Sequence, residues 1–253
     1  MIHRSAVVHP KAKIGTGCEI GPYCVIGEHV TLGKKCKLHS HVVIDGHTNI
    51  GKENEFFPYG SIGLKTQDLK WSGGITWTEI GDNNSIREYV SINSATGDGE
   101  ATRIGSNNHL LAYTHIGHNC VIGNNVIMSN AVLAGHVVVE DNARISVCAI
   151  HQFCRIGKMS MIGGCSKVVQ DVPPYMLADG NPAETRTINK VAMERSGMPD
   201  ETQKALRAAY KTLFREGLTI SNALAKIEKK LPPLPEILHL IQFIRGSERG
   251  IGK

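Results

Sequence analysis

Histidines gather in one stretch of the sequence in a pattern that suits proton transfer. His118 lies in the segment THIGHNC, and His136 follows in the segment LAGH. A neutral imidazole near pH 7 can take a proton from a hydroxyl nucleophile. Gly135 precedes His136, and a glycine lets a backbone N–H approach a developing oxyanion closely. These residue types predict a general-base site next to an oxyanion donor.

Two other interpretations of the histidines compete with this one. A single histidine is most often a turn or surface residue, and the chain has 12 of them. Stacked histidines also bind metal in hexapeptide-repeat carbonic anhydrases, where two of the ligands are five residues apart. No two histidines of this chain have that spacing. We therefore favour proton transfer and expect neither a metal nor another cofactor.

A repeat of six residues predicts the element that positions these side chains. The first part of the chain has an apolar residue at every sixth position, namely Ile2, Val8, Ile14, Ile20, Ile26, Leu32, Leu38, Ile44, Ile50, Phe56 and Ile62. Neither a helix nor a simple strand has this period, whereas a parallel β-helix with three short faces per coil does. His136 follows His118 by three repeats, which make one full coil, so the two side chains should stack along one face.

Interruptions of the repeat predict loops and two short rungs. The apolar positions are lost near residues 63–79 and 93–103, which we interpret as loops extruded from the coil, where functional residues often lie. The repeat then resumes, but the rungs Met128–Val132 and Ile145–Ala149 have only five residues. A slip of one residue turns side chains to the wrong face unless a corner absorbs it.

The pattern changes after about residue 170, which predicts a second domain. We expect the β-helix to span residues 1–185, with its last part, up to Pro182, a connector. A helical domain should follow over 186–253. Helices should start at Pro199-Asp200 and end at Gly217, start at a cap on Ser221 and end before Pro232, and run from Pro235 to Gly246. Their apolar faces need the end of the coil or a neighbouring subunit to cover them.

Charge and composition narrow the class further. Residues 186–253 carry 13 Lys or Arg and 7 Asp or Glu, a net +6, against −1 for residues 1–185. This basic tail is either a solvated surface or a docking patch for an acidic partner, and it has no nucleic-acid-binding signature. No apolar run reaches the ~20 residues of a membrane span, which predicts a cytoplasmic protein. The seven cysteines should be small buried residues rather than disulfides or zinc ligands.

Longer motifs in the same order resemble the UDP-N-acetylglucosamine O-acyltransferases, which catalyse the first step of lipid A synthesis. The motifs are HTNIG (47–51), QDLKW (67–71), IRE (86–88), HIGHNC (115–120), LAGH (133–136), HQFC (151–154), GGCS (163–166) and QDVPPY (170–175). The resemblance covers nearly the whole chain. It implies a left-handed β-helix, a homotrimer with sites between subunits, and transfer of an (R)-3-hydroxyacyl group from acyl carrier protein to the sugar 3-hydroxyl. The donor's phosphopantetheine would carry the acyl group.

The resemblance also implies roles for individual residues. His118 corresponds to the catalytic base and Gly135 to the oxyanion donor. Gly164, in GGCS, corresponds to the position that limits the length of the acyl chain. The residues that correspond to substrate contacts are Asp68, Lys70, His115, His136, His151, Gln152, Asn189 and Arg195. Arg195 would suit the diphosphate, because a guanidinium binds phosphate oxygens in a fork.

The sequence departs from the family pattern near the expected base. The family often has an acidic residue directly after the catalytic histidine, whereas this chain has Asn119. An amide can orient an imidazole but does not stabilise its charged form as a carboxylate does. The second loop has Asn93-Ser94 in place of the usual His-Arg, so the resemblance assigns no role to that loop.

Three alternatives to this function remain open on the sequence. A CoA-dependent acetyltransferase would share the β-helix but not QDLKW and QDVPPY. A catalytically silent scaffold would bind the nucleotide sugar or the carrier protein alone. A related enzyme would acylate the nitrogen of a 3-amino sugar.

Overall fold

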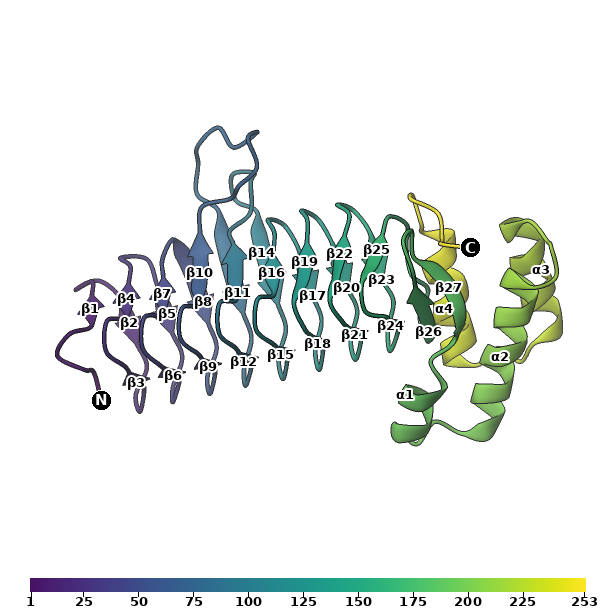
Figure 1. Ribbon diagram of the computed structural model, residues 1–253, viewed down its shortest axis with the longest axis horizontal. Coiled ribbons are helices and arrows are strands. Elements are labelled where there is room, and N and C mark those ends of the chain that lie inside the picture. Colours follow the sequence, from purple (N-terminus) through teal and green to yellow (C-terminus); the bar gives the residue numbers. More distant parts are fainter.

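Each six-residue repeat forms a short strand followed by a corner. The computed structural model describes all 253 residues. The strands of the repeat form three parallel sheets, which are the three faces of a single β-helix (Figure 1). Successive coils pair in register: Val7 and Val8 lie beside Val25 and Ile26, which follow them by three repeats. The predicted parallel β-helix is confirmed.

Three sheets make the faces of the coil. The first contains β1 (Val7–Val8), β4 (Val25–Ile26), β7 (Val43–Ile44), β10 (Ser61–Leu64), β13 (Ser91–Asn93), β16 (His115–Ile116), β19 (Ala131–Leu133), β22 (Cys148–Ile150) and β25 (Ser166–Val168). The second contains β2 (Lys13–Ile14), β5 (Thr31–Leu32), β8 (His47–Ile50), β11 (Trp77–Ile80), β14 (Ala101–Ile104), β17 (Val121–Ile122), β20 (Val138–Val139) and β23 (Arg155–Ile156). The third contains β3 (Glu19–Ile20), β6 (Lys37–Leu38), β9 (Glu55–Phe56), β12 (Ser85–Ile86), β15 (His109–Leu110), β18 (Ile127–Met128), β21 (Arg144–Ile145), β24 (Met161–Ile162), β26 (Met176–Asp179) and β27 (Glu184–Ile188).

The inside of the coil is filled by one apolar side chain per rung. Phe56, Ile62 and Ile116 have no exposed surface. Cysteines fill corners, where their thiols donate to the backbone of the next coil, as from Cys24 to the His39 carbonyl at 2.8 Å. All seven cysteines are free, but Cys165 is exposed, so the expectation that all of them are buried is wrong for that residue.

Both five-residue rungs keep their apolar side chains on the correct face. Met128 and Leu133 are fully buried on either side of the first short corner. Leu133 pairs with Ile116, so this coil is one residue shorter than a coil of three full repeats. The missing residue falls between Met128 and Asn130, while Asn130 keeps the left-handed conformation (φ of 45°) that Tyr113 has at the same corner of the previous coil (φ of 63°). Asparagine tolerates this conformation better than most residues.

Two loops leave the coil on the same side and are bound to each other (Figure 1). The first joins β10 to β11 over residues 65–76, and the second joins β13 to β14 over residues 94–100. The hydroxyl oxygens of Thr66 and Thr96 are 2.9 Å apart, and the backbone N–H of Ile75 donates to the Asp98 carboxylate at 2.7 Å. The loops therefore act as one unit above the coil.

The segment expected to be a connector contains a strand. β26 continues the third sheet by pairing with β24, and β27 returns antiparallel to it. Apolar side chains at the end of a coil need a cover, and this hairpin begins to supply it.

The tail contains four helices, one more than expected. They are α1 (Lys190–Arg195), α2 (Asp200–Phe214), α3 (Ile220–Lys230) and α4 (Pro235–Arg245). The side chain of Thr219, not Ser221, caps α3. Buried residues of α2, α3 and α4 pack with Tyr175, Met176 and Ile188, so the end of the coil covers their apolar faces. None of the helices is long and apolar enough to cross a membrane.

Candidate active site

His118 lies on the corner between β16 and β17, directly against Gly135 of the next coil. The two occupy the same place in successive coils because Ile116 pairs with Leu133. A Cβ added at position 135 would overlap the imidazole of His118, so only glycine fits under this ring. The N–H of Gly135 donates no hydrogen bond within the chain and is free to bind a substrate oxygen.

The spacing of three full repeats predicted that His136 would stack on His118, and this prediction is wrong. Because the coil is one residue shorter here, His136 follows Gly135 at the left-handed position of the corner, with φ of 60°. Its ring meets His118 edge-on at 5.2 Å between centroids and stacks on Phe153 at 4.7 Å. Burial, and then the neighbouring His118, lower the pKa of His136. The imidazole of His136 is therefore uncharged at neutral pH and packs edge-on against His118.

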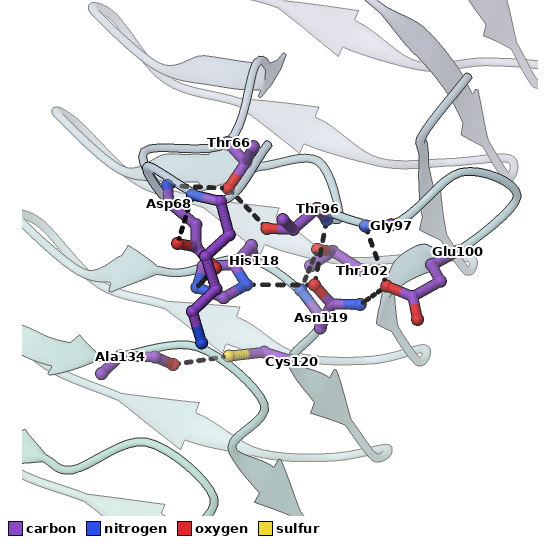
Figure 2. A network of polar contacts seen from close by, with 11 residues as sticks. Thr66, Asp68, Thr96, Gly97, Glu100, Thr102, His118, Asn119, Cys120 and Ala134 are labelled. Atoms are coloured by element: carbon purple, nitrogen blue, oxygen red, sulfur yellow. Dashed lines mark hydrogen bonds and ion pairs between the residues drawn. The ribbon is translucent and has the colours of Figure 1, made fainter. Parts of the chain in front are cut away.

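Asn119 is the hydrogen-bond partner of the His118 nitrogen that points away from the cleft. Nδ1 of His118 is 3.0 Å from Oδ1 of Asn119. The amide NH₂ of Asn119 donates to Oε2 of Glu100 at 2.6 Å (Figure 2). With Nδ1 bonded to this side chain, Nε2 of His118 is the nitrogen that faces Asp68 and Gly135.

The first loop brings Asp68 over the imidazole. Oδ2 of Asp68 is 3.7 Å from Nε2 of His118, and both side chains are largely shielded from solvent. This distance exceeds a hydrogen bond and leaves the carboxylate available to a bound group. Thr66 accepts from the Asp68 N–H at 3.0 Å, and Asp68 accepts from the Lys70 N–H at 3.0 Å, which holds the loop in shape.

These side chains surround a cleft of about 500 Å³. Its lining residues are Gln67, Asp68, Leu69, Lys70, Asn93, His115, Gly117, His118, Ala134, Gly135 and Gln152. His115 is bonded to Ser91 at 2.7 Å, and burial lowers the pKa of its imidazole. The structure thus places Asp68, Lys70, His115, His118, Gly135 and Gln152 around one cleft.

Sequence reasoning missed Asn93 and Glu100. Asn93 lines the cleft, with its NH₂ donating to the Lys65 carbonyl at 3.1 Å and its Oδ1 buried without a partner. Both residues belong to the second loop or its base, whose departure from the family pattern left it without an assigned role. The start of the second interruption of the repeat, at residue 93, was the available signal for Asn93.

Besides His136, four predicted residues do not line this cleft. His151 is exposed and bonded to the Gln152 carbonyl at 3.1 Å. Asn189 and Arg195 line a second cleft of about 530 Å³ beside α1, with Met159 and Leu177. Gly164 lies on a different corner, between β24 and β25, and a Cβ there would meet nothing within 4 Å. A single chain does not bring Gly164, Asn189 or Arg195 to His118, whereas His151 lies at the edge of the cleft, next to Gln152.

The histidines of the cleft form no metal centre. No group of three or more His, Cys, Asp or Glu side chains is arranged to hold a metal ion. The neighbouring Cys120 donates to the Ala134 carbonyl at 3.1 Å, and burial raises the pKa of its thiol to about 12. Cys120 is therefore a packed thiol and not a nucleophile.

Two family models match parts of the chain. Residues 171–252 match the model described as UDP N-acetylglucosamine O-acyltransferase, domain 2. Residues 1–34 and 101–128 match the bacterial transferase hexapeptide repeat.

Curated relatives match over the full length. An acyl-[acyl-carrier-protein]–UDP-N-acetylglucosamine O-acyltransferase of Thermodesulfovibrio yellowstonii is 49% identical over 99% of this chain and 98% of the relative. The Myxococcus xanthus protein of the same name is 44% identical over the same shares.

Solved structures agree with the coil and the tail together. The UDP-N-acetylglucosamine acyltransferase of Bacteroides fragilis is 40% identical, with a TM-score of 0.97 over 100% of both chains. The Moraxella catarrhalis O-acyltransferase is 40% identical, with a TM-score of 0.95 over 100% of this chain and 99% of that one. The expected left-handed parallel β-helix with a C-terminal helical region is confirmed.

The contact between Gly135 and His118 predicts the effect of one added methyl group. Gly135→Ala should push the imidazole out of place and lower kcat for acyl transfer on the order of 10²-fold or more, the scale of losing a positioned proton acceptor. The coil should keep its melting temperature, because the displaced group is the end of a side chain. Gly60→Ala is the matched control, since its Cβ finds its nearest atom at 3.5 Å. A Gly135→Ala enzyme with normal kcat would refute the contact's importance.

Proposed function

Since the chain belongs to the UDP-N-acetylglucosamine O-acyltransferase family, it transfers an acyl group from acyl carrier protein to UDP-N-acetylglucosamine, and we propose that His118 is the general base. The observation that carries this proposal is the pairing of Nδ1 with Asn119 at 3.0 Å. Such pairing leaves Nε2 free to accept a proton inside the cleft. Of the two histidines that line the cleft, only His118 has its Nδ1 hydrogen-bonded to a side-chain amide and its Nε2 next to the unpaired N–H of Gly135.

The reaction uses few groups. Nε2 of His118 takes the proton of the sugar 3-hydroxyl as its oxygen attacks the thioester carbonyl carbon of an (R)-3-hydroxyacyl donor. The new C–O bond forms a tetrahedral oxyanion, which the N–H of Gly135 stabilises. Collapse breaks the C–S bond, and the imidazolium returns the proton to the departing phosphopantetheine thiolate. The donor supplies the only prosthetic group, and the protein supplies proton transfer and orientation.

The remaining cleft residues bind the two substrates. Asp68 lies within reach of the same space as Nε2, and its carboxylate accepts from a sugar hydroxyl. Lys70, His115 and Gln152 line the same cleft and supply donors for the sugar or the acyl carbonyl. His136 and His151 lie beside this cleft rather than in it, so their contacts with substrate are with groups at its edge.

The site is completed by a neighbouring subunit of a homotrimer. Asn189 and Arg195 line their own cleft at the tail end of the chain, far along the coil from β16 (Figure 1). In a trimer with parallel subunits, the extended nucleotide sugar spans from the His118 cleft of one chain toward the tail of its neighbour. Arg195 then binds the diphosphate as a two-pronged donor, and Asn189 assists it.

The basic tail offers a docking surface for the carrier protein. Lys204, Arg207 and Lys211 are exposed on one side of α2, at spacings that place them on the same face. Acyl carrier protein is acidic, so this face steers it toward the acyl-transfer site.

The general-base role predicts a large effect of one substitution. His118→Ala should lower kcat by roughly 10²–10⁴-fold, because general-base catalysis contributes this much. KM for UDP-N-acetylglucosamine should change little, since other residues hold the nucleotide. His109→Ala, at an exposed position of the preceding coil, is the control. Near-normal turnover of His118→Ala would exclude it as the base.

A trimer with shared sites predicts complementation. Light scattering should give about three times the mass of one chain. His118→Ala and Arg195→Ala enzymes should each be nearly inactive, yet trimers mixed at equal amounts should recover roughly a quarter of the normal activity, because that share of interfaces joins an intact His118 to an intact Arg195. No recovery on mixing would mean that both residues act within one chain.

Gly164 predicts a preference for long acyl chains. We propose that it lies along the acyl groove, where the absent side chain leaves room and each further buried CH₂ contributes about 0.8 kcal/mol. Its corner has no contact that needs glycine, since a Cβ meets nothing within 4 Å. Gly164→Met should therefore fold normally and switch the preference in kcat/KM toward shorter donors. An unchanged preference in competition assays would contradict the groove assignment.

A further inference from the structure

Asn119 links the proposed base to a carboxylate outside the cleft. Its Oδ1 is 3.0 Å from Nδ1 of His118, and its Nδ2 is 2.6 Å from Oε2 of Glu100. Figure 2 shows the three side chains in a row, with Glu100 farthest from the cleft. Glu100 does not line the cleft, and Asn119 is the side chain that connects it to His118 by hydrogen bonds.

Two hydrogen bonds fix which end of the amide faces the histidine. The Thr96 N–H donates to Oδ1 at 3.0 Å, so the oxygen must lie on that side. Glu100 offers only acceptor oxygens and therefore requires the NH₂ group on its own side. The backbone of Asn119 is held as well, since its N–H donates to the Thr102 hydroxyl at 2.8 Å.

The orientation of the amide decides the tautomer of His118. An oxygen next to Nδ1 accepts a hydrogen bond, so Nδ1 carries the proton and Nε2 keeps its lone pair. A reversed amide would present NH₂ to Nδ1 and favour the proton on Nε2. Nε2 faces Asp68 and Gly135, and in the reversed state it could not accept the proton of a hydroxyl nucleophile.

Glu100 is held in place by the second loop. Its Oε2 also accepts from the Gly97 N–H at 3.0 Å, and its own N–H donates to the Gly97 carbonyl at 3.0 Å. Its carbonyl accepts from the Trp77 N–H at 2.9 Å, at the start of β11. The bonds from Asn119 and then Gly97 lower the pKa of the carboxyl group, which keeps it an acceptor at neutral pH.

We propose that Glu100 is a positioning residue that, through the amide of Asn119, holds His118 in the tautomer with a free Nε2. The proposal rests on the general-base role of His118. Glu100 is exposed in the chain, so water screens its charge. Its contribution is therefore the direction of the Asn119 amide rather than charge stabilisation of the imidazolium.

The first test compares two substitutions of Glu100. Glu100→Ala should lower kcat on the order of tenfold or more, the lower end of the range for losing the outer partner of a functional histidine. KM for both substrates should stay unchanged. Glu100→Gln should keep most of kcat, because its amide oxygen can accept from both Asn119 and Gly97. Loss of kcat in Glu100→Gln equal to that in Glu100→Ala would overturn an orienting role.

The second test uses Asn119→Asp, because a carboxylate has two equivalent oxygens and needs no orienting. In the Asn119→Asp background, Glu100→Ala should cost nothing in kcat and should raise it by relieving repulsion, because two carboxylates would face each other where Nδ2 of Asn119 now lies 2.6 Å from Oε2 of Glu100. With Asn119 present, Glu100→Ala should cost its full factor. A residue that only stabilises the loop would cost the same factor in both backgrounds, and that result would refute the proposal. Glu79→Ala controls for removal of a surface carboxylate, since Glu79 pairs with Arg103 at 2.8 Å on neighbouring strands.

A third comparison separates this inference from the proposed function. Glu100→Ala should have no further effect on the residual rate of a His118→Ala enzyme, because the group that it positions is gone. If His118→Ala is inactive and Glu100→Ala retains its kcat, the positioning role alone fails. If His118→Ala turns over normally, the general-base assignment fails and Glu100 has no base to position. Unchanged melting temperature and oligomeric mass show that each variant is folded.

Discussion

The whole structure depends on one apolar side chain per rung packing on its counterpart in the next coil. Phe56, Ile62 and Ile116 are fully buried in this stack. Because the short strands of the coil are not stable alone, pairing with the coils above and below supplies their hydrogen bonds and their hydrophobic cover. The last coil has no following coil, so the hairpin of β26 and β27 and the helices of the tail cover its end.

A scaffold of this kind fixes corners more firmly than any loop could. His118 and Gly135 occupy equivalent corner positions on adjacent coils, and the contact between them is set by strand register. The two extruded loops then add Asp68 and Glu100 from above. Hydrogen bonds between the loops, such as that between the hydroxyls of Thr66 and Thr96 at 2.9 Å, make the upper side of the cleft depend on both loops. The proposed base therefore lies on a corner of two paired coils and beneath two loops that are hydrogen-bonded to each other.

Asn119 places an amide rather than a carboxylate beside the imidazole of His118. A carboxylate would accept a hydrogen bond from the Nδ1–H of His118 in either orientation and would stabilise the positive charge of the imidazolium. An amide accepts on one side only and therefore needs partners that choose this side. Thr96 and Glu100 are those partners, and both come from the second loop. The amide at position 119 and its two partners in the second loop therefore form one local arrangement.

The sequence alone determined the repeat, because an apolar residue every six positions satisfies only a coil with short flat faces. It also determined that Gly135 and His118 belong to one site, since their motifs follow one another along the same part of the repeat. It placed His136 wrongly, because the residue lost at the short corner changes the vertical neighbour of His118 from His136 to Gly135. Only the tertiary structure showed that Glu100 contacts Asn119. Glu100 lies in a loop that interrupts the six-residue repeat, so the repeat does not predict its neighbours. The repeat determines strand register, whereas the direction in which an extruded loop folds back depends on hydrogen bonds between residues far apart in the sequence.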